Sequence, residues 1–255
     1  MSSRAAEPVR AVSFDLGGTL IAASPSVGAI YASVCREHGL DLEAEACDRS
    51  FEAAWARRGA ADTGGRDRFS TYPGGEDAWW RGVILEVLRS CDVPEERAPA
   101  VEAFRDAFAS ARAWRIYDDV PATLSSLRAA GYRLAILSNW DSRMPALLGR
   151  LDLLGHFDAI LCSALEGLEK PHPEFFGRVA SALRIPAEQT LHVGDLVRED
   201  YLGATRAGMR ALWLDRGRNG SESRAAVDPR HVVTSIAEVA QALEDQQRIS
   251  TGART

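Results

Sequence analysis

The chain contains few cysteines and no long hydrophobic run. Among its 255 residues are four cysteines, Cys35, Cys47, Cys91 and Cys162, and no two of them form a C-x-x-C pair. Scattered cysteines in apolar surroundings are typical of free thiols in a reducing compartment, so we expect a cytoplasmic protein. No apolar stretch reaches the roughly 20 residues that cross a bilayer, and the N-terminal segment lacks the apolar core of a secretory signal.

Charge of one sign is not concentrated anywhere in the chain. The 30 basic and 36 acidic residues are mixed throughout and leave a net charge of −6. Such a chain has no basic stripe for nucleic acid and no polybasic patch for a membrane surface, so we expect neither partner. The hydrophobic share of 46% is ordinary for a globular protein, and the length is sufficient for a large core. A monomer and a homodimer both agree with this composition.

Short apolar runs that end at polar or glycine residues predict the strands. They cover residues 10–16, 132–139, 157–164, 190–195 and 210–215. Near-continuous apolar runs of this length are typical of parallel strands that are buried on both faces. Amphipathic helical patterns, such as the one over residues 120–131, separate the last four runs. The alternation predicts an α/β fold with a Rossmann-like, doubly wound parallel sheet.

Between the first run and Val120 the pattern is helical only. Helices are expected at 24–39, 44–58, 77–90 and 96–111, and the glycine-rich loop at 57–68 is expected to be solvated and mobile. A helical stretch of this size predicts a separate domain. We therefore assign residues 1–20 and 113–255 to the sheet domain and residues 21–112 to a helical domain. The polar tails 1–8 and 246–255 are expected to be flexible.

Polar residues follow the predicted strands at the place where open α/β sheets bind ligands, beyond the carboxyl ends of the strands. In chain order they are Asp15, Gly17, Gly18, Thr19, Ser138, Asn139, Lys170, Asp195 and Asp200. Together they suit phosphoryl transfer. The carboxylate of Asp15 can attack phosphorus and carry the group as an acyl phosphate. Because a carboxylate repels a phosphate, a divalent cation has to stand between them.

Mg²⁺ is the cation that this set of groups predicts, because it prefers carboxylates, carbonyls and water. Asp15 and Asp195 offer the carboxylates, and Gly17 offers a backbone carbonyl.

The remaining groups can hold the oxygens of the phosphate. The predicted substrate contacts are the side chains of Ser138 and Lys170 and the backbone N–H groups of Gly18, Thr19 and Asn139. Stabilisation of charge on these oxygens is the main work of a phosphoryl-transfer site.

The order of the motifs Asp-x-x-Gly-Thr-Leu, Ser-Asn, Lys-Pro and Gly-Asp-x-x-x-x-Asp resembles the haloacid dehalogenase-like (HAD) hydrolase superfamily, subfamily IA. The helical stretch lies where that superfamily has its type 1 helical cap. The resemblance implies a Mg²⁺-dependent hydrolase with Asp15 as nucleophile and metal ligand. It also implies that Ser138 and Lys170 are catalytic residues that bind phosphate, that Asp195 is a metal ligand, and that Asp200 completes the metal site.

Gly17 departs from that pattern, because most phosphatases of the superfamily have an aspartate there as general acid and base. Loss of such a group typically costs about 10²–10⁴ in rate. The prediction is nonetheless a phosphatase that acts on a small phosphorylated metabolite through an aspartyl-phosphate on Asp15. Two alternatives stay open. One is a 2-haloacid dehalogenase, whose leaving halide needs no proton, and the other is a weakly active or non-catalytic binding protein.

Other residues near these motifs have structural explanations. His192, inside an apolar run, is expected to be a hydrogen-bonded core histidine. Trp79 and Trp80 are adjacent on a helix and are expected to pack in its core. Arg143 either contacts a substrate anion or forms an ordinary ion pair.

Overall fold

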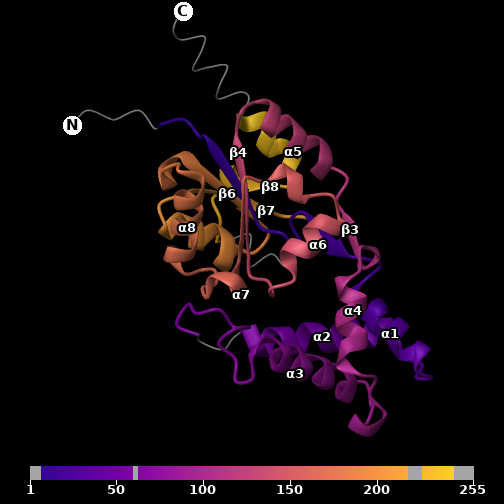
Figure 1. The fold of residues 1–255 in the computed structure, drawn as a ribbon. Helices are drawn as coiled ribbons and strands as arrows, with labels where there is room; N and C mark the ends of the chain where they lie inside the picture. The colour runs from indigo at the N-terminus through magenta and orange to yellow at the C-terminus, as the bar shows by residue number, and fades with distance from the viewer. Residues whose placement is uncertain (1–6, 60–62, 218–225, 244–255) are drawn as a thin grey trace, which may run out of the picture.

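A six-stranded parallel sheet forms the centre of the molecule (Figure 1). The computed structural model describes residues 7–59, 63–217 and 226–243. The strand order is β5-β4-β1-β6-β7-β8. The strands are β1 (Ala11–Phe14), β4 (Arg133–Ser138), β5 (Ala159–Cys162), β6 (Thr190–Gly194), β7 (Arg210–Leu214) and β8 (Val232–Val233). This arrangement confirms the predicted doubly wound α/β fold, to which the structure adds the short strand β8.

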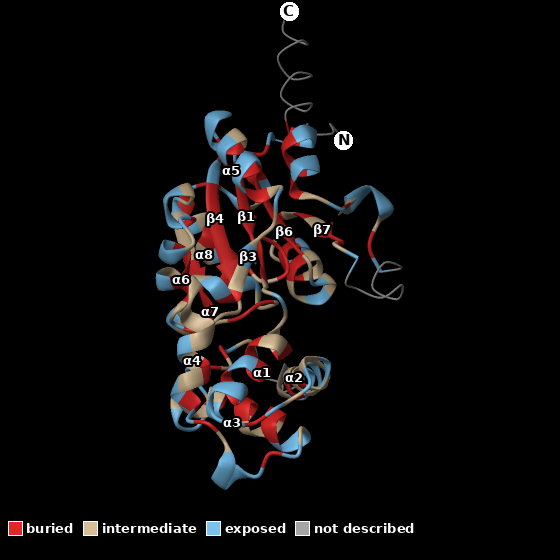
Figure 2. Cartoon of the chain, turned by 90° about the vertical axis from the view of Figure 1, so that its right-hand side faces the viewer, coloured by how far each residue is buried: buried red, intermediate tan, exposed pale blue. Residues whose placement is uncertain are grey.

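The first strand of the chain lies in the middle of the sheet. β1 pairs in parallel with β4 and with β6, so that Phe14 is opposite Ile136 on one side and Val193 on the other. All four residues of β1 are buried, and Figure 2 shows β1, β4 and β6 as the buried interior. This central position explains the apolar composition of the strand, because helices cover both of its faces.

Alternate residues of the strands pack against different helices. Val12, Phe14 and Ile136 belong to the hydrophobic cluster that includes Leu124 of α5. The residues that alternate with them in the strands, such as Ala11, Ala135 and Leu137, belong to the cluster that includes Phe175 of α8. The helices of the sheet body are α5 (Val120–Ala129), α6 (Met144–Arg150), α7 (Ser163–Glu166), α8 (Pro173–Leu183), α9 (Gly203–Arg206) and a π-helix at Val197–Leu202. Short 3₁₀ helices lie at Glu95–Arg97, Ala111–Ala113, Leu154–His156, Ala187–Gln189 and Pro229–His231.

Four helices between β1 and β4 form a body that we call the helical segment. They are α1 (Val27–Glu37), α2 (Ala44–Gly59), α3 (Gly75–Ser90) and α4 (Val101–Ala109), and Figures 1 and 2 show them beyond one end of the sheet. Tyr31, Trp79, Val83 and Phe104 belong to a hydrophobic cluster of their own. Trp79 and Trp80 pack edge to face at 4.8 Å, and Trp79 is buried, as expected of core residues.

A two-stranded antiparallel sheet joins the helical segment to the sheet body. β2 (Ile21–Ala23) pairs with β3 (Trp114–Ile116), although the two strands are about ninety residues apart in sequence. Sequence periodicity does not reveal a pair of strands as short as these. The pair lies where the boundaries at residues 20 and 113 were placed, and the division into two domains stays a prediction.

The first helix begins later than the sequence pattern predicts. α1 starts at Val27, and Ser26 caps it by accepting a hydrogen bond from the backbone N–H of Ala29 at 3.1 Å. Asp48 of α2 accepts bonds from Ser26 and from the backbone of Gly28, so contact between two helices sets this boundary.

The loop at 57–68 also differs from the prediction of a solvated segment. Its residues 60–62 lie outside the described part of the chain, but Asp67 is fully buried and Arg68 pairs with Glu169 of the sheet body. Residues 1–6 and 246–255 of the predicted tails lie outside the described residues as well. All four cysteines are free thiols, as expected.

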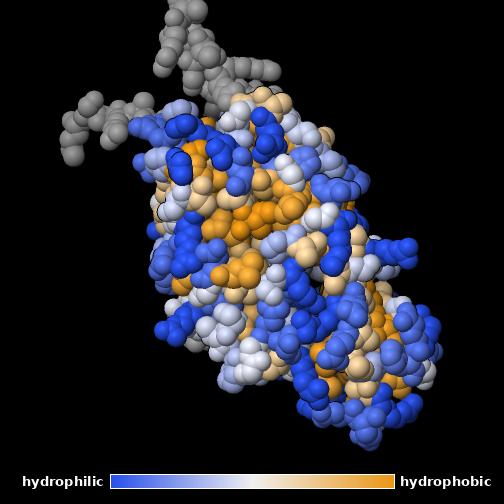
Figure 3. Space-filling model, in the orientation of Figure 1, coloured by the Kyte–Doolittle hydropathy of each residue, from blue (hydrophilic) through white to orange (hydrophobic). Residues whose placement is uncertain are grey.

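The surface shows no membrane-spanning element among the described residues. Within 7–59, 63–217 and 226–243, no helix is both long and apolar enough to cross a bilayer. Figure 3 shows apolar areas on the face of Figure 1 that charged side chains interrupt.

The separate core of the helical segment leads to a stability prediction. Phe104 is fully buried and lies 4.9 Å from the ring of Tyr31. We expect Phe104→Ala to lower the free energy of unfolding by about 3–5 kcal/mol in urea titrations. The exposed control Leu165→Ala, with 58% exposure, should stay within about 0.5 kcal/mol of the parent. Hydrogen exchange of Phe104→Ala should rise in α1–α4; an equal rise in β1 and β4 would contradict a separate core.

Candidate active site

Three predicted site residues meet at the carboxyl end of β1. Asp15 follows the strand directly, and its backbone N–H donates to the carbonyl of Val193 at 2.9 Å. Its side-chain Oδ1 accepts a hydrogen bond from Ser138 Oγ at 2.9 Å and another from Lys170 Nζ at 2.7 Å. Because β4 ends beside β1, Ser138 comes next to Asp15 although the two are far apart in sequence. Burial raises the pKa of Asp15, an effect that Lys170 opposes.

The ammonium of Lys170 lies between two carboxylates. Nζ donates to Asp15 Oδ1 at 2.7 Å and to Asp200 Oδ1 at 2.6 Å, and the side chain is almost fully buried. Burial acts to lower the pKa of Lys170, but the two carboxylates outweigh it and raise the pKa above its usual value. Asn139 holds the backbone of Lys170 with two bonds, from Lys170 N to Oδ1 at 2.7 Å and from Nδ2 to Lys170 O at 2.9 Å.

Asp200 supports this arrangement from the π-helix. Its Oδ1 accepts from Lys170 and from His192 Nε2 at 3.1 Å, and its Oδ2 accepts from the backbone N–H of Leu196 at 2.9 Å. Burial acts to raise the pKa of Asp200, but Lys170 and His192 outweigh it and hold the pKa below its usual range. Gly194 has no side chain because an added Cβ would lie 2.2 Å from Asp200 Cγ.

His192 is a satisfied core histidine, as predicted, and it also touches the site. An ionised carboxylate only accepts hydrogen bonds, so His192 Nε2 carries the hydrogen that faces Asp200. In the neutral ring Nδ1 is then an acceptor, and Ser13 Oγ donates to it at 2.7 Å. Burial lowers the pKa of His192, which favours this neutral form.

Asp195 lies against the loop that follows β1. Thr19 Oγ1 donates to Asp195 Oδ1 at 3.3 Å. Gly18 has a φ of +83°, and an added Cβ would lie 2.4 Å from Asp195 Oδ2, so both the backbone conformation and the close approach require glycine. The backbone N–H of Gly18 donates to the carbonyl of Ile21 at 2.8 Å. The turn thus uses the donor that the sequence analysis assigns to phosphate, and that assignment stays a prediction.

Asp15, Asp195 and Asp200 form a cluster that could hold a metal ion. Each offers a carboxylate oxygen, and these oxygens lie within 4.8 Å of one another. Burial, followed by the charges of Asp15 and Asp200, raises the pKa of Asp195 to about 8. An all-oxygen donor set suits a hard cation such as Mg²⁺. The three residues therefore fit the predicted metal. Asp200 also accepts hydrogen bonds from Lys170, His192 and the backbone of Leu196.

The place of the missing second acid is filled by an aromatic ring. A Cβ added at Gly17 would lie 2.9 Å from Cζ3 of Trp140. Trp140 packs in turn on Trp114, with ring centroids 5.1 Å apart. Sequence reasoning identified the gap at Gly17 but not its occupant, because Trp140 comes from the loop after another strand.

Arg216, which the sequence analysis did not single out, contacts the same loop. Its guanidinium donates to the carbonyl of Thr19 at 2.8 Å and to Asp119 at 3.0 Å, and it lies 3.8 Å from the ring centroid of Tyr117. A positive residue just after β7 was the only available signal. By contrast, Arg143 forms the ordinary ion pair that was one of its two expected roles, with Asp141 at 2.6 Å.

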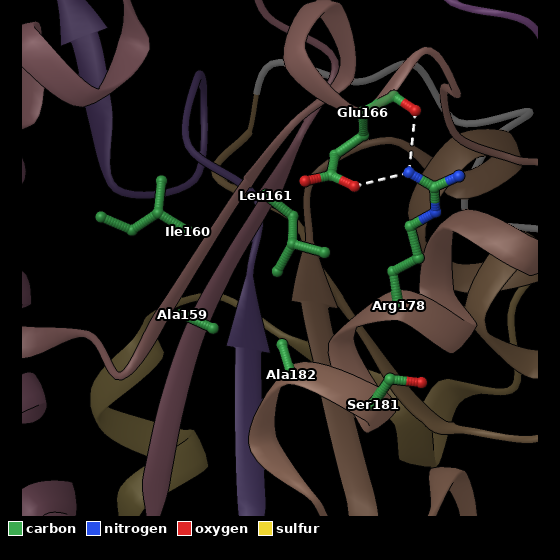
Figure 4. Close-up of a pocket in the computed structure, with 7 residues that line it drawn as sticks. All are labelled: Ala159, Ile160, Leu161, Glu166, Arg178, Ser181 and Ala182. Carbon is green, nitrogen blue, oxygen red and sulfur yellow. Dashed lines mark hydrogen bonds and ion pairs between the residues drawn. The ribbon is translucent and has the colours of Figure 1, made fainter.

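A groove of about 450 Å³ lies elsewhere, beside the edge strand β5 (Figure 4). It is lined by Ala159, Ile160, Leu161, Glu166, Arg178, Ser181 and Ala182. Arg178 donates to the carboxylate of Glu166 at 2.6 Å and to its carbonyl at 2.9 Å. None of the predicted site residues lines this groove, so it is separate from the candidate active site.

The fold and the strand-end cluster define a class of protein that comparison with known families identifies. The family model described as haloacid dehalogenase-like hydrolase matches residues 9–208. The chain therefore belongs to the haloacid dehalogenase-like hydrolase family, and it is a hydrolase.

Individual relatives agree with this assignment. "Haloacid dehalogenase-like hydrolase domain-containing protein 3" of Mus musculus is 30% identical over 241 residues, which cover 92% of this chain and 94% of the relative. A phosphoserine phosphatase of Thermus thermophilus is 33% identical over 191 residues, 73% of each chain. The crystal structure of a 2-haloacid dehalogenase from Pseudomonas syringae aligns with a TM-score of 0.62 at 22% identity, covering 93% of this chain and 99% of the other. The last similarity shows the fold alone.

The raised pKa of Asp195 predicts a pH-dependent affinity for Mg²⁺. At pH values below its pKa of about 8, Asp195 holds a proton, and a cation has to displace that proton in order to bind. We expect the affinity for Mg²⁺, measured by calorimetry, to fall by about tenfold for each pH unit below that value. The variant Asp195→Asn should bind Mg²⁺ far more weakly and lose most of this dependence.

The raised pKa of Asp195 also makes the stability of the fold depend on pH. A carboxyl group with a raised pKa contributes stability that is present at low pH and is lost as the pH rises from about 4 to about 8. Mg²⁺ should therefore raise the melting temperature more at pH about 8.5 than at pH about 6. Equal shifts at both values would contradict the assignment of the proton to the metal cluster.

Proposed function

We propose that the protein is a cytoplasmic, Mg²⁺-dependent phosphatase that hydrolyses a small phosphorylated metabolite through an aspartyl-phosphate on Asp15. One observation carries the proposal: the Lys170 ammonium sits between Asp15 and Asp200, with Asp195 beside them. Once Asp195 loses its proton, three carboxylates share a single ammonium, and their net negative charge repels an incoming anion. A bound Mg²⁺ would supply the positive charge that lets a phosphate approach Asp15. The cation would be held by Asp15, Asp195, Asp200 and the carbonyl of Gly17.

The protein's own residues divide the reaction into two steps. A carboxylate oxygen of Asp15 attacks phosphorus, the bond from phosphorus to the leaving oxygen breaks, and that oxygen takes up a proton from solvent, which the attacking water returns in the second step. Water then attacks the aspartyl-phosphate, restoring the carboxylate of Asp15 and releasing inorganic phosphate. Ser138 and Lys170 already donate to Asp15, and in both steps they stabilise negative charge on the transferred group. Thr19 and Asn139 complete the walls of this site.

Gly17 narrows the class of substrate. It has no side chain to protonate a leaving oxygen, and Trp140 fills the space where one would stand. Substrates with a good leaving group, such as acyl phosphates and sugar 1-phosphates, need that proton least. The helical segment, acting as a cap, would close over the sheet edge and exclude water during transfer.

The alternative function is a 2-haloacid dehalogenase. Gly17 favours it, since a departing halide needs no proton. The acidic cluster argues against it, because without a cation Asp15, Asp195 and Asp200 would repel the carboxylate of a haloacid. The chain also departs from the dehalogenase branch of the superfamily it resembles, which uses no metal and has serine and asparagine at the place of Gly194 and Asp195. A non-catalytic binding protein has no evident use for the intact set of Asp15, Lys170 and Asp195.

A panel of phosphate esters and acyl phosphates tests the proposal directly. Release of inorganic phosphate in Mg²⁺, abolished by a chelator and restored by excess Mg²⁺, is the expected result. Release of halide from 2-haloacids in the presence of chelator would establish the dehalogenase in its place. Inertness toward both sets would contradict catalysis of either kind.

Removal of the nucleophile gives a second prediction. Asp15→Asn should lower kcat on any accepted phosphate by at least about 10⁴-fold, as nucleophile removal does in other hydrolases. The matched control is Asp41→Asn, which changes an exposed aspartate of the helical segment with a side chain 93% exposed. Mass spectrometry of the quenched reaction should detect a phosphoryl group on the parent and the control but not on Asp15→Asn. Retention of activity by Asp15→Asn would exclude the proposed intermediate.

The space beside Gly17 gives a third prediction. Gly17→Asp alone should bring little gain, because its side chain meets Trp140. With the ring removed, Gly17→Asp/Trp140→Ala should exceed the single variant Trp140→Ala by about 10²-fold in kcat on an alkyl phosphate. The comparison with Trp140→Ala corrects for lost packing. No difference between these two variants would mean that the absent acid does not limit the rate.

A further inference from the structure

The helical segment makes a β-type contact with the part of the sheet body that leads into Lys170. Arg66 and Leu168 form an antiparallel bridge. Beside it, Asp67 N donates to the carbonyl of Gly167 at 3.2 Å, and Glu169 N donates to the carbonyl of Gly65 at 3.1 Å. Figure 1 shows this connection between α2 and α3 reaching toward α7.

A nearly buried ion pair reinforces that contact. Arg68 Nε donates to Glu169 Oε2 at 2.7 Å, its Nη2 donates to Oε1 at 3.3 Å, and its backbone N–H donates to Oε2 at 3.1 Å. Thr63 Oγ1 adds a fourth bond to Oε1 at 3.2 Å. The side chains of Arg68 and Glu169 are 11% and 8% exposed, so loss of either partner would leave a charge in a poorly solvated place. The geometry therefore holds this contact far more firmly than an exposed ion pair.

We propose that Arg68 is a positioning residue for Lys170 and acts through Glu169. Glu169 directly precedes Lys170, and the backbone of Lys170 is held on its other side by Asn139. The chain at Lys170 is thus fixed between the sheet body and the helical segment. The proposal rests on the function proposed above and deepens it, because an ammonium that stabilises transferred charge has to be held within about 0.5 Å.

The loop that follows Ser138 has a contact of the same kind. The backbone N–H and hydroxyl of Ser142 both donate to the carboxylate of Glu76 in α3, at 3.0 and 2.8 Å. The loop that follows Ser138 and the loop that carries Lys170 are therefore both bonded to the helical segment. Contact with the helical segment therefore also helps to position the side chains of Ser138 and Lys170, which are proposed to bind phosphate. The Arg68–Glu169 pair is the more buried of the two contacts and the better one to test.

The experiment compares Arg68→Met, Arg68→Lys and the double variant Arg68→Met/Glu169→Gln with the parent. The control is Arg57→Met, which removes an ion pair between Arg57 of α2 and Glu86 of α3, within the helical segment. The first readout is hydrogen exchange of the peptide 167–172 in the full protein, without substrate. The second is kcat and KM for p-nitrophenyl phosphate with Mg²⁺. If Arg68→Met does not fold, the double variant, which leaves no unpaired charge, takes its place.

Arg68→Met should exchange about tenfold faster at 167–172 and lose about tenfold in kcat, with KM changed by less than about twofold. Arg68→Lys should recover both to within about threefold, and Arg57→Met should match the parent. Unchanged exchange in Arg68→Met overturns the proposal, and so does faster exchange with unchanged kcat. If the parent hydrolyses no phosphate at all, the proposed function fails separately, and exchange at 167–172 alone decides whether Arg68 positions this segment.

Discussion

The shared ammonium of Lys170 is the interaction on which the rest of the site depends. Asp15 ends the central strand, and Asp200 belongs to a helix that follows a neighbouring strand. The two buried carboxylates offer oxygens within 4.8 Å of each other. Without a positive charge between them they would repel each other, and one would hold a proton. Lys170 opposes the rise in the pKa of Asp15 and holds the pKa of Asp200 below its usual range, and Asn139 fixes the backbone from which Lys170 extends. The proposed nucleophile thus accepts a hydrogen bond from an ammonium that belongs to a third part of the chain.

The crowding of carboxylates at this site changes the pKa of Asp195. Lys170 bonds to Asp15 and Asp200, whereas burial and the charges of these two carboxylates raise the pKa of Asp195 to about 8. At the proposed metal site, a proton and a cation would therefore compete for Asp195 according to pH. Gly18 and Gly194 make this crowding possible, because a side chain at either position would collide with a carboxylate. The glycines of these motifs serve the close approach of acidic groups as much as the turn of the chain.

Much of this site can be predicted from the sequence, because strand ends are local features. Asp15, Ser138 and Asp195 each stand just after an apolar run, and parallel strands bring their carboxyl ends to one edge of the sheet. The same pattern predicts a parallel, doubly wound sheet, whereas the order of its strands, with β1 between β4 and β6, comes from the structure. The pairing of β2 with β3 does not, since three-residue strands leave no periodicity to detect.

Contacts between loops that are distant in sequence could not be predicted from the sequence. Trp140 and Arg216 reach the loop after β1 from other strands, and no spacing within their own segments announces it. The loop before α3 has a composition typical of solvated chain, yet Arg68 is nearly buried against Glu169. In each case a three-dimensional partner overrides the local signal.

Trp140 carries one further consequence. Indole emission changes with the polarity and charge around the ring, and this ring lies against Gly17, two residues from Asp15. Trp140 is therefore an intrinsic fluorophore at the edge of the candidate active site. Because the chain contains six tryptophans, the emission that belongs to this ring is the difference between the parent and a variant without it.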